Sequence, residues 1–194
     1  TASNTLRNGN LKRERTASWE MGTDLRFLDD RVGLTATYYR KATTNQILSL
    51  DVSAMTGFTS RRINAGKISN RGMELMVEAT PVRLDNGFQW DVTANFSRDR
   101  AYVDELYGDA ETLVLDTYYS VSVEARKGER YGAMYGRKYV RDGAGNIVVG
   151  SNGLPLNSST NPFEQLGNYN PDWVAGLTNR LSWRGIDVSA LIDI

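Results

Sequence analysis

Cysteine and histidine are both absent from the 194 residues of the sequence. The absence of cysteine excludes disulfide scaffolds, thiolate metal sites and cysteine nucleophiles. The absence of histidine excludes Ser-His-Asp hydrolases and His-ligated zinc enzymes, and it removes the commonest general base near neutral pH. Those classes of enzyme and metal site are therefore excluded. We expect a protein that is not an enzyme, with no catalytic residue, no bound metal and no cofactor.

A surplus of charge of one sign and a long apolar run are missing too. Lysine and arginine number 23, aspartate and glutamate number 23, and the formal net charge is zero. A nucleic-acid-binding protein would need a basic stripe to displace the counterions of the phosphates, so we expect no nucleic-acid partner. No run of about 20 apolar residues is present, which excludes a transmembrane helix. The residues from Thr1 to Thr5 do not resemble the start of a signal peptide.

The sequence does contain a regular alternation of apolar and polar residues. Between Arg15 and Leu28 the odd positions are mainly apolar and the even positions are polar or charged. Because successive side chains of a strand point to opposite faces, this period of two predicts a strand. The pattern recurs in five further segments: Val32–Tyr39, Gly72–Ala79, Phe88–Ser97, Trp173–Trp183 and Ile186–Asp193. The exceptions are Met76, Val174 and Leu191 on polar faces and Asn179 on an apolar face.

The connections between these segments are of two kinds. Three are short and rich in Asp, Asn and Gly, as hairpin turns are: 29–31, 83–87 and 184–185. Two are long, about 26 residues near Thr44–Ser69 and about 74 residues near Asp99–Asp172. Alternate connections of an up-and-down sheet lie at opposite ends of its strands. We therefore expect the short turns at one end and both long loops at the other.

Two kinds of sheet share this pattern: a soluble antiparallel sheet with one wet face, and a transmembrane β-barrel whose apolar face meets lipid. Three features favour the barrel. The alternating segments contain 8 to 14 residues, and we expect strands of about 10–13 residues. That length suits a tilted membrane strand of roughly 9–11 residues better than a globular strand of about 5–6. The asymmetry of short turns and long loops is that of outer-membrane barrels.

The third feature is that aromatic residues lie at both ends of the apolar faces. Membrane proteins place such amphipathic rings at the level of the lipid headgroups. The long-loop end holds Trp19, Tyr38, Phe96 and Trp173, and the short-turn end holds Phe27, Phe88, Trp90 and Trp183. The fold class that we predict is an all-β, antiparallel up-and-down transmembrane β-barrel fragment with long extracellular loops, in contact with outer-membrane lipid.

A membrane sheet has to close on itself, because every backbone N–H and C=O in hydrocarbon must be paired. Six strands are fewer than the roughly 8 of the smallest common barrels. The sequence also ends at Asp193-Ile194, inside its last predicted strand. We therefore expect residues 1–194 to be part of one larger β-barrel domain whose closing strands lie elsewhere.

Four segments, in order along the chain, resemble parts of the SusC/RagA-type TonB-linked outer-membrane transporters. They are Leu11–Asp24, Ile63–Glu74, Tyr135–Arg137 together with Asp142–Asn146, and Leu166–Trp173. They resemble, in turn, the segment that opens the late barrel, a loop-to-strand junction, a late extracellular insertion and the entry into a following strand. Arg13 stands where the family often has proline. The resemblance covers almost the whole chain.

This resemblance implies a barrel of about 22 strands around a plug, in the outer membrane of a Bacteroidetes-like Gram-negative bacterium. It implies import of large nutrients, glycans or peptides, with energy from the inner-membrane TonB complex and a SusD-like surface lipoprotein as the cap. The plug domain, the TonB-contacting segment and the signal peptide lie N-terminal in this family, so we expect them outside the sequence. Two alternatives share the alternating pattern: a non-energised porin or adhesin barrel, and a soluble β-rich glycan-binding protein.

The candidate functional residues fall in two groups. Charged side chains on the polar strand faces would line the lumen, where they contact a plug or cargo or simply pair across strands. These lumen-facing candidates are Glu20, Asp24, Arg26, Glu74, Glu78, Asp91 and Arg180. The longer loop holds eight of the ten tyrosines, whose rings can stack on cargo, contact a partner or pack the loop itself. The extracellular-loop contact candidates among them are Tyr118, Tyr119, Tyr131 and Tyr135.

Two patterns that suggest chemistry have simpler explanations. Paired carboxylates about 5–10 Å apart hydrolyse glycosides, but acids on many strands of one polar face always form such pairs. The segment Asp142–Asn146 resembles the start of a calcium loop, yet it lacks the acid at the closing position of an EF-hand-type loop. We predict a hairpin turn there.

Overall fold

The computed structural model describes residues 4–108, 110–157 and 163–194, and the chain forms two compact units. We call Thr16–Ala42, Ser69–Ala101 and Pro171–Ile194 the wall unit. We call Thr1–Arg15, Thr43–Ile68 and Tyr102–Asn170 the loop unit. The wall unit contains most of the predicted strands, and the loop unit contains most of the two predicted long loops.

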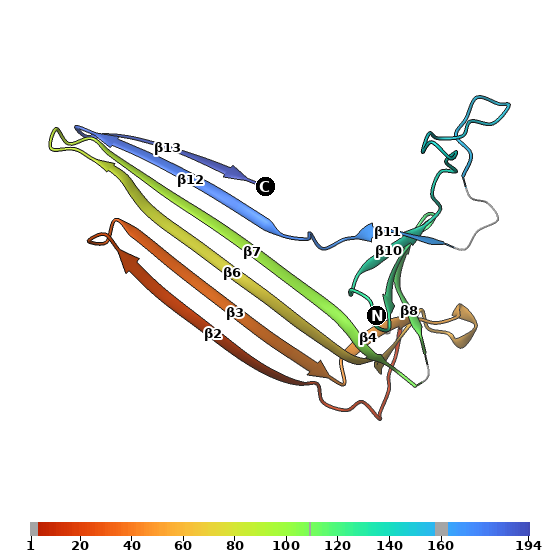
Figure 1. Cartoon of the computed structure of the whole chain (residues 1–194). Helices are drawn as coiled ribbons and strands as arrows, with labels where there is room; N and C mark the ends of the chain where they lie inside the picture. The colour runs from red at the N-terminus through yellow and green to blue at the C-terminus, as the bar shows by residue number, and fades with distance from the viewer. Residues whose placement is uncertain (1–3, 109, 158–162) are drawn as a thin grey trace. The chain divides into compact units, whose positions relative to one another are not determined.

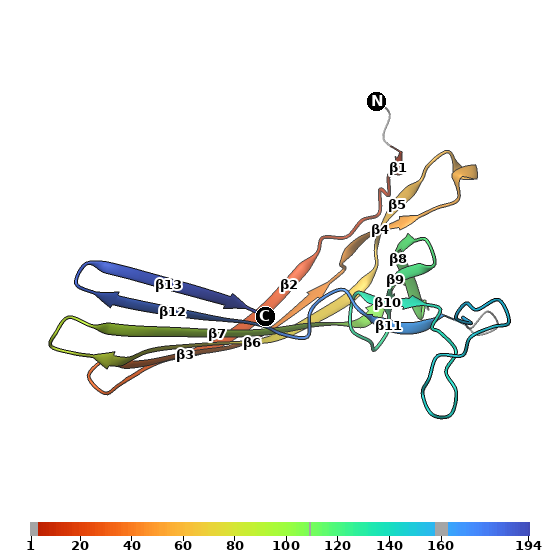
Figure 2. The same ribbon diagram turned by 90° about the horizontal axis from the view of Figure 1, so that it is seen from above.

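The wall unit is a single six-stranded sheet in the order β13-β12-β7-β6-β3-β2 (Figures 1 and 2). Its strands are β2 (Arg15–Phe27), β3 (Val32–Thr44), β6 (Gly66–Arg83), β7 (Gln89–Leu106), β12 (Val174–Trp183) and β13 (Ile186–Asp193). All six predicted strands are present, and their order is that of the predicted meander. The all-β, up-and-down fold class is therefore confirmed.

The three tight turns lie together at one end of this sheet, on the left in Figure 1, and the long loops leave from the other end. Arg184 and Gly185 both have positive φ, 47° and 86°, as a two-residue type I′ hairpin requires. At the turn between β6 and β7, Gly87 has a φ of 87°. The Leu84 N–H there donates to the Phe88 carbonyl oxygen at 2.9 Å. The predicted separation of short turns from long loops is confirmed.

The register of the wall strands sorts the side chains into two unlike faces. Leu177 on β12 lies opposite Ala94 on β7 and Ile192 on β13. One residue further along, Thr178 lies opposite Thr93 on β7. Because the period is two, the even positions of β7 join one apolar face, and the odd positions join a polar face.

The apolar face carries large exposed side chains. Met21 is 68% exposed, Val188 58% and Trp19 51%, and the six strands of the wall unit lie in one sheet. A surface of this extent is unusual for a soluble monomer and marks a contact with lipid or protein. The geometry is that of a barrel wall rather than one half of a sandwich.

Asn179 is a polar residue with an amide side chain that the alternation places on this apolar face. It lies opposite Val92 on β7, and its side-chain oxygen accepts a hydrogen bond of 3.3 Å from the indole N–H of Trp90. An amide in an apolar environment is destabilising by several kcal/mol unless it is hydrogen-bonded. The indole partner therefore explains how the sequence tolerates this exception.

Strands β6 and β7 are longer than predicted, at 18 residues each. The alternation predicts a start at Gly72 for β6 and an end at Ser97 for β7, whereas the strands extend to Gly66 and Leu106. From Arg98 onward the positions that continue the apolar face of β7 include three charged residues, Arg98, Arg100 and Asp104. Outside hydrocarbon a paired strand needs no apolar face, so the signal that reveals it disappears before the strand ends.

The loop unit folds into two small sheets in place of irregular loops. One has the order β1 (Thr5–Leu6), β5 (Ser60–Asn64), β4 (Ile47–Asp51), with a short 3₁₀ turn at Ala54–Thr56. The other has the order β11 (Glu164–Asn168), β10 (Ala133–Gly136), β9 (Val121–Arg126), β8 (Thr112–Tyr118). Val103, Leu106 and Ala125 form a small buried core, with Leu113 and Tyr131 packed against it.

No helix in the described part of the chain is long and apolar enough to cross a membrane.

Candidate functional site

A groove of about 380 Å³ lies on the polar face of the wall unit, near the short turns. Four of the predicted lumen-facing residues line it together: Arg26, Glu78, Asp91 and Arg180. They come from four different strands, β2, β6, β7 and β12. The threonines Thr80, Thr93 and Thr178 complete much of the lining. The sheet therefore brings together charges that are far apart in the sequence.

The charges in and around this groove are paired with groups on neighbouring strands. The Arg26 guanidinium lies 3.9 Å from the Glu78 carboxylate, and the Thr80 hydroxyl donates to Asp91 at 2.7 Å. Arg180 reaches Asp187 on β13 at 3.1 Å. The ion pairs are about half exposed, so each stabilises the fold only weakly. Acids held in this way by cations and hydroxyls form a wet, polar wall.

The other three lumen-facing candidates lie away from the groove. Asp24 accepts a hydrogen bond of 2.7 Å from the Thr35 hydroxyl. Glu20 and Glu74 are close enough to the hydroxyl of Tyr39 to act on it electrostatically. The seven candidates thus form no single site, and their functional role stays a prediction.

Tyr39 and Asp99 form a contact on the polar face that the sequence reasoning missed. Tyr39 is hydrogen-bonded to Asp99, which also accepts a bond of 3.3 Å from the Asn70 amide. The ring of Tyr39 fills the space where a β-carbon on Gly72 would stand, the usual way in which an aromatic ring covers a strand glycine. The position of Tyr39 on the polar face of β3 is the sequence feature that could have indicated this contact.

No group of three or more carboxylates that could hold a metal ion is present within residues 4–108, 110–157 and 163–194.

Two of the loop tyrosines are exposed and adjacent. Tyr118 is 75% exposed and Tyr119 is 88% exposed, and their ring centroids are 4.6 Å apart in an edge-to-face arrangement. The positive φ of Tyr119, 51°, belongs to the turn between β8 and β9. A turn that presents two rings outward is suited to contact with a cargo or a partner.

The other two candidate tyrosines, Tyr131 and Tyr135, pack inside the loop unit. Tyr135 is only 3% exposed, and the Arg126 guanidinium lies over its ring, 3.4 Å from the centroid. The Tyr135 hydroxyl donates to Glu129, and Arg126 donates to the buried Glu124 at 2.8 Å. Tyr131 is half-buried against the small core. Of the four predicted candidates, Tyr118 and Tyr119 are therefore the two with exposed rings.

Burial is the main reason why the pKa of Tyr135 is raised to about 12 from its ordinary value of 10.0, and its bond to Glu129 adds to the shift. The folded state then holds this proton more tightly than the unfolded state. The contribution of Tyr135 to stability is therefore complete below pH 10 and is lost as the pH rises to 12. In urea unfolding of the full-length protein, followed by near-ultraviolet circular dichroism, Tyr135→Phe is expected to flatten the decline of stability over this range.

Tyr118→Phe is the matched control for that titration, since it removes a hydroxyl from an exposed site. Its stability is expected to follow the wild-type curve. An equally steep decline in Tyr135→Phe and the wild type would show that the buried hydroxyl is not the group responsible.

The predicted hairpin turn at Asp142–Asn146 is confirmed. Arg141 and Ile147 pair as antiparallel neighbours, and the Asp142 carboxylate accepts hydrogen bonds of 2.9 Å from the backbone N–H groups of Ala144 and Asn146. The bonds from Asn146 are the main reason why the pKa of Asp142 is lowered. This carboxylate stabilises its own turn.

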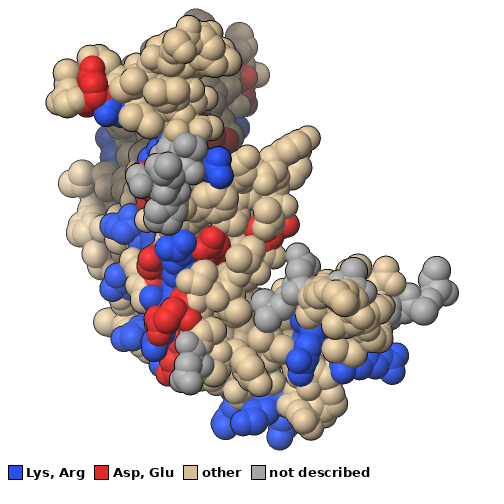
Figure 3. Space-filling model, turned by 90° about the vertical axis from the view of Figure 1, so that its right-hand side faces the viewer, with Lys and Arg blue, Asp and Glu red and all other residues tan. Residues whose placement is uncertain are grey.

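Acidic and basic side chains lie next to one another in a band on the face drawn in Figure 3. This mixing agrees with the zero formal net charge.

The comparisons with known proteins agree with this geometry. Residues 1–187 match the family described as "TonB dependent receptor-like, beta-barrel". TonB-dependent receptor P39 of Formosa agariphila is 32% identical over 133 residues, which are 69% of this chain and 12% of that protein. TonB-dependent receptor SusC of Bacteroides thetaiotaomicron is 28% identical over 198 residues, 94% of this chain and 19% of that protein. The chain thus spans at most about 20% of the length of these relatives.

Solved structures show the same fold. The structure of the RagAB peptide transporter superposes with a TM-score of 0.74 at 18% identity, over 93% of this chain and 21% of that one. The "open-open" state of the RagAB peptide importer gives a TM-score of 0.72 at 18% identity, over 95% of this chain and 20% of that one.

The single-layer sheet with unlike faces, the tight turns at one end and the long loops at the other define a section of a transmembrane β-barrel wall. The chain belongs to the TonB-dependent receptor family, as its resemblance to the SusC/RagA-type members predicts. The β-barrels of this family lie in the outer membrane.

Proposed function

We propose that the protein containing this chain imports large nutrients, glycans or peptides, across the outer membrane. The chain supplies part of the barrel wall and of the extracellular loops, and no bond chemistry takes place on it. The observation that carries this proposal is the division of one uncovered sheet into an apolar face and a charged, hydroxyl-rich face. A sheet of this kind separates lipid from an aqueous lumen.

The polar groove is suited to line that lumen. It offers three arginines, three carboxylates and three threonine hydroxyls, on the polar face of the wall. Balanced, partly paired charges bind polar surfaces without holding any one ligand tightly. Such a lining fits both a polar plug domain and a passing chain of sugars or amino acids.

Three partners complete the proposal. The TonB complex would act through an N-terminal region and a plug domain that precede residues 1–194, and a SusD-like surface lipoprotein would cap the extracellular side. The exposed pair Tyr118 and Tyr119 is suited to contact either the lipoprotein or the cargo. The description of RagAB as a peptide transporter supports peptides as one cargo class.

The test is uptake by cells in which the complete gene has been deleted and then restored. Two fluorescent pools serve as probes, a mixture of oligosaccharides and a tryptic peptide digest, both too large for general porins. Deletion is expected to lower uptake of one pool at least tenfold, and a protonophore is expected to do the same in the restored strain. Energy coupling predicts this, because TonB draws on the proton gradient of the inner membrane.

Three outcomes would contradict the proposal. Uptake that persists with the protonophore would indicate a non-energised porin, and unchanged uptake of both pools would exclude import of these cargo classes. Extraction of the full-length protein by buffer without detergent would exclude a membrane barrel. Entry of a small solute such as glycerol is the control for general damage to the cells.

A further inference from the structure

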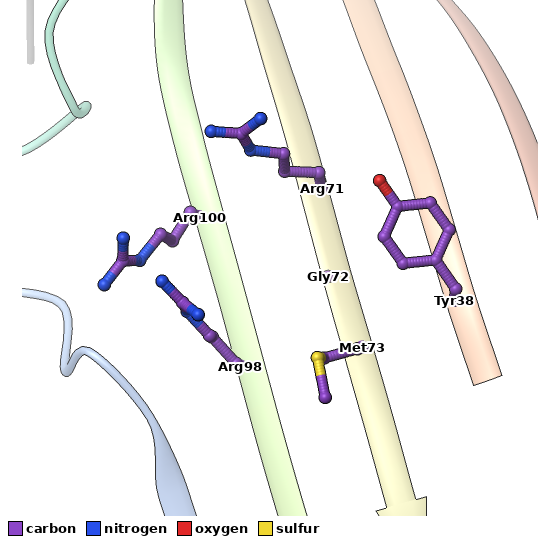
Figure 4. A pocket seen from close by; sticks show the side chains of 6 residues that line it. All are labelled: Tyr38, Arg71, Gly72, Met73, Arg98 and Arg100. Carbon is purple, nitrogen blue, oxygen red and sulfur yellow. The ribbon is translucent and has the colours of Figure 1, made fainter. Parts of the chain in front are cut away.

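A small pocket of about 180 Å³ on the wall unit collects three arginines from two neighbouring strands. Arg71 comes from β6, and Arg98 and Arg100 come from β7. Tyr38 of β3, Gly72 and Met73 complete the lining (Figure 4). None of the residues singled out for the lumen or for the loops belongs to this pocket.

The arginines continue the apolar face, at its long-loop end. Arg98 and Arg100 follow Phe96 at intervals of two along β7, and Arg71 precedes Met73 in the same way along β6. Phe96 stacks on Trp173 at 6.1 Å, and Tyr38 packs on Trp19 at 5.4 Å. Aromatic rings of this kind mark the headgroup level of a bilayer. Arg98 and Arg100 lie two and four residues beyond Phe96 along β7. Since a strand advances about 3.3 Å per residue, they lie just beyond the headgroup level, on the face that meets lipid.

The charge around the pocket is predominantly positive. Arg100 reaches the Asp172 carboxylate at 3.2 Å, and that carboxylate is 64% exposed. The Nε of Arg100 is buried and is the atom that lacks a hydrogen-bond partner among the described side chains. Three guanidinium groups and one exposed carboxylate give the pocket a net positive charge, which favours an anion as its ligand.

Single arginines at a membrane surface need no ligand, because their long side chains extend into the headgroup layer. This cluster differs in three respects: the guanidinium groups share one pocket, one of them buries an unpaired N–H, and a tyrosine closes the side. Guanidinium groups match the oxygens of a phosphate by paired, charge-assisted hydrogen bonds. Met73 and the apolar face continue directly from the pocket toward the membrane interior.

We propose that Arg71, Arg98 and Arg100 bind the phosphate of an anionic lipid in the outer leaflet, with its acyl chains lying over Met73 and the apolar face. The proposal rests on the membrane location given under the proposed function. The bound lipid would hold the long-loop ends of β6 and β7 at a fixed depth in the membrane.

The test is native mass spectrometry of the full-length protein in a non-ionic detergent doped with phosphatidic acid or with phosphatidylcholine. Phosphatidic acid, which carries a phosphomonoester, is expected to be retained at least tenfold better than phosphatidylcholine, whose phosphate is balanced by choline. The triple variant Arg71→Gln, Arg98→Gln and Arg100→Gln is expected to lose this preference. The single variant Arg98→Gln is expected to weaken it severalfold, which keeps the test informative if the triple variant fails to fold.

The matched control removes the same charge from three exposed arginines of the loop unit, Arg13→Gln, Arg61→Gln and Arg137→Gln. This variant is expected to keep the wild-type preference for phosphatidic acid. Equal retention of phosphatidic acid by the pocket variants and the control would overturn the proposal. So would displacement of the lipid by an equal concentration of inorganic phosphate, which would indicate a site for free phosphate. Extraction without detergent would instead contradict the membrane location itself.

Discussion

Replacement of Leu75 by arginine is expected to lower the free energy of unfolding of the full-length protein in lipid by about 2–4 kcal/mol, the range for a charge at the bilayer midplane on a barrel wall. The polar contacts of β6 fix which way Leu75 points. Glu78 pairs with Arg26 and Thr80 donates to Asp91, so the even positions of β6 face the polar side and the odd positions face lipid. Urea unfolding in vesicles measures the loss.

Substitutions on the same face and on the opposite face of β6 and β7 provide the controls for Leu75→Arg. Val92→Arg, on the same face of β7, is expected to destabilise as much as Leu75→Arg. Glu74→Lys and Thr93→Lys, on the polar face, are expected to change stability by less than about 1 kcal/mol, as surface substitutions usually do. Equal losses at odd and even positions of β6 would mean that the two faces do not meet different solvents.

The wall could be predicted from the sequence because its two faces meet unlike solvents. Leu177 and Thr178 are adjacent in the chain, and their cross-strand neighbours repeat the contrast between them, with Ala94 beside the first and Thr93 beside the second. Every strand therefore records the same division in its own residues. The turns carried equally local signals, such as the Arg184-Gly185 pair with positive φ.

The candidate sites could be predicted only in part, because they depend on register and packing. The alternation was enough to place Arg26 and Arg180 on the polar face. Their position in one groove could not be predicted, because it depends on how four strands align. The roles of the loop tyrosines depended on neighbours that no period reveals. Tyr135 lies under Arg126, whereas Tyr118 lies in a turn. The prediction that residues 1–194 belong to one barrel domain stays a prediction.

The second large effect is expected at Gly66, where the chain enters β6 with a φ of 130°. A β-carbon added there would overlap the backbone of Glu105 and Leu106 on β7. The position is also fixed by hydrogen bonds, since the Gly66 carbonyl accepts from the Gln46 N–H at 3.1 Å and Ala65 is 2% exposed. Gly66→Ala therefore combines backbone strain of about 1–3 kcal/mol with overpacking of about 1–3 kcal/mol.

The expected loss of about 2–6 kcal/mol, the sum of these two terms, falls on the start of β6 and the end of β7. Hydrogen exchange of the full-length protein measures it as loss of protection at residues 66–68 and 103–106. Gly57→Ala is the matched control in the same loop, because Gly57 also has a positive φ, 79°, but has no atom within 4 Å of the added carbon. Strain alone costs about 1–2 kcal/mol there. Equal effects of the two substitutions would mean that the close approach of β7 is not the reason why residue 66 is glycine.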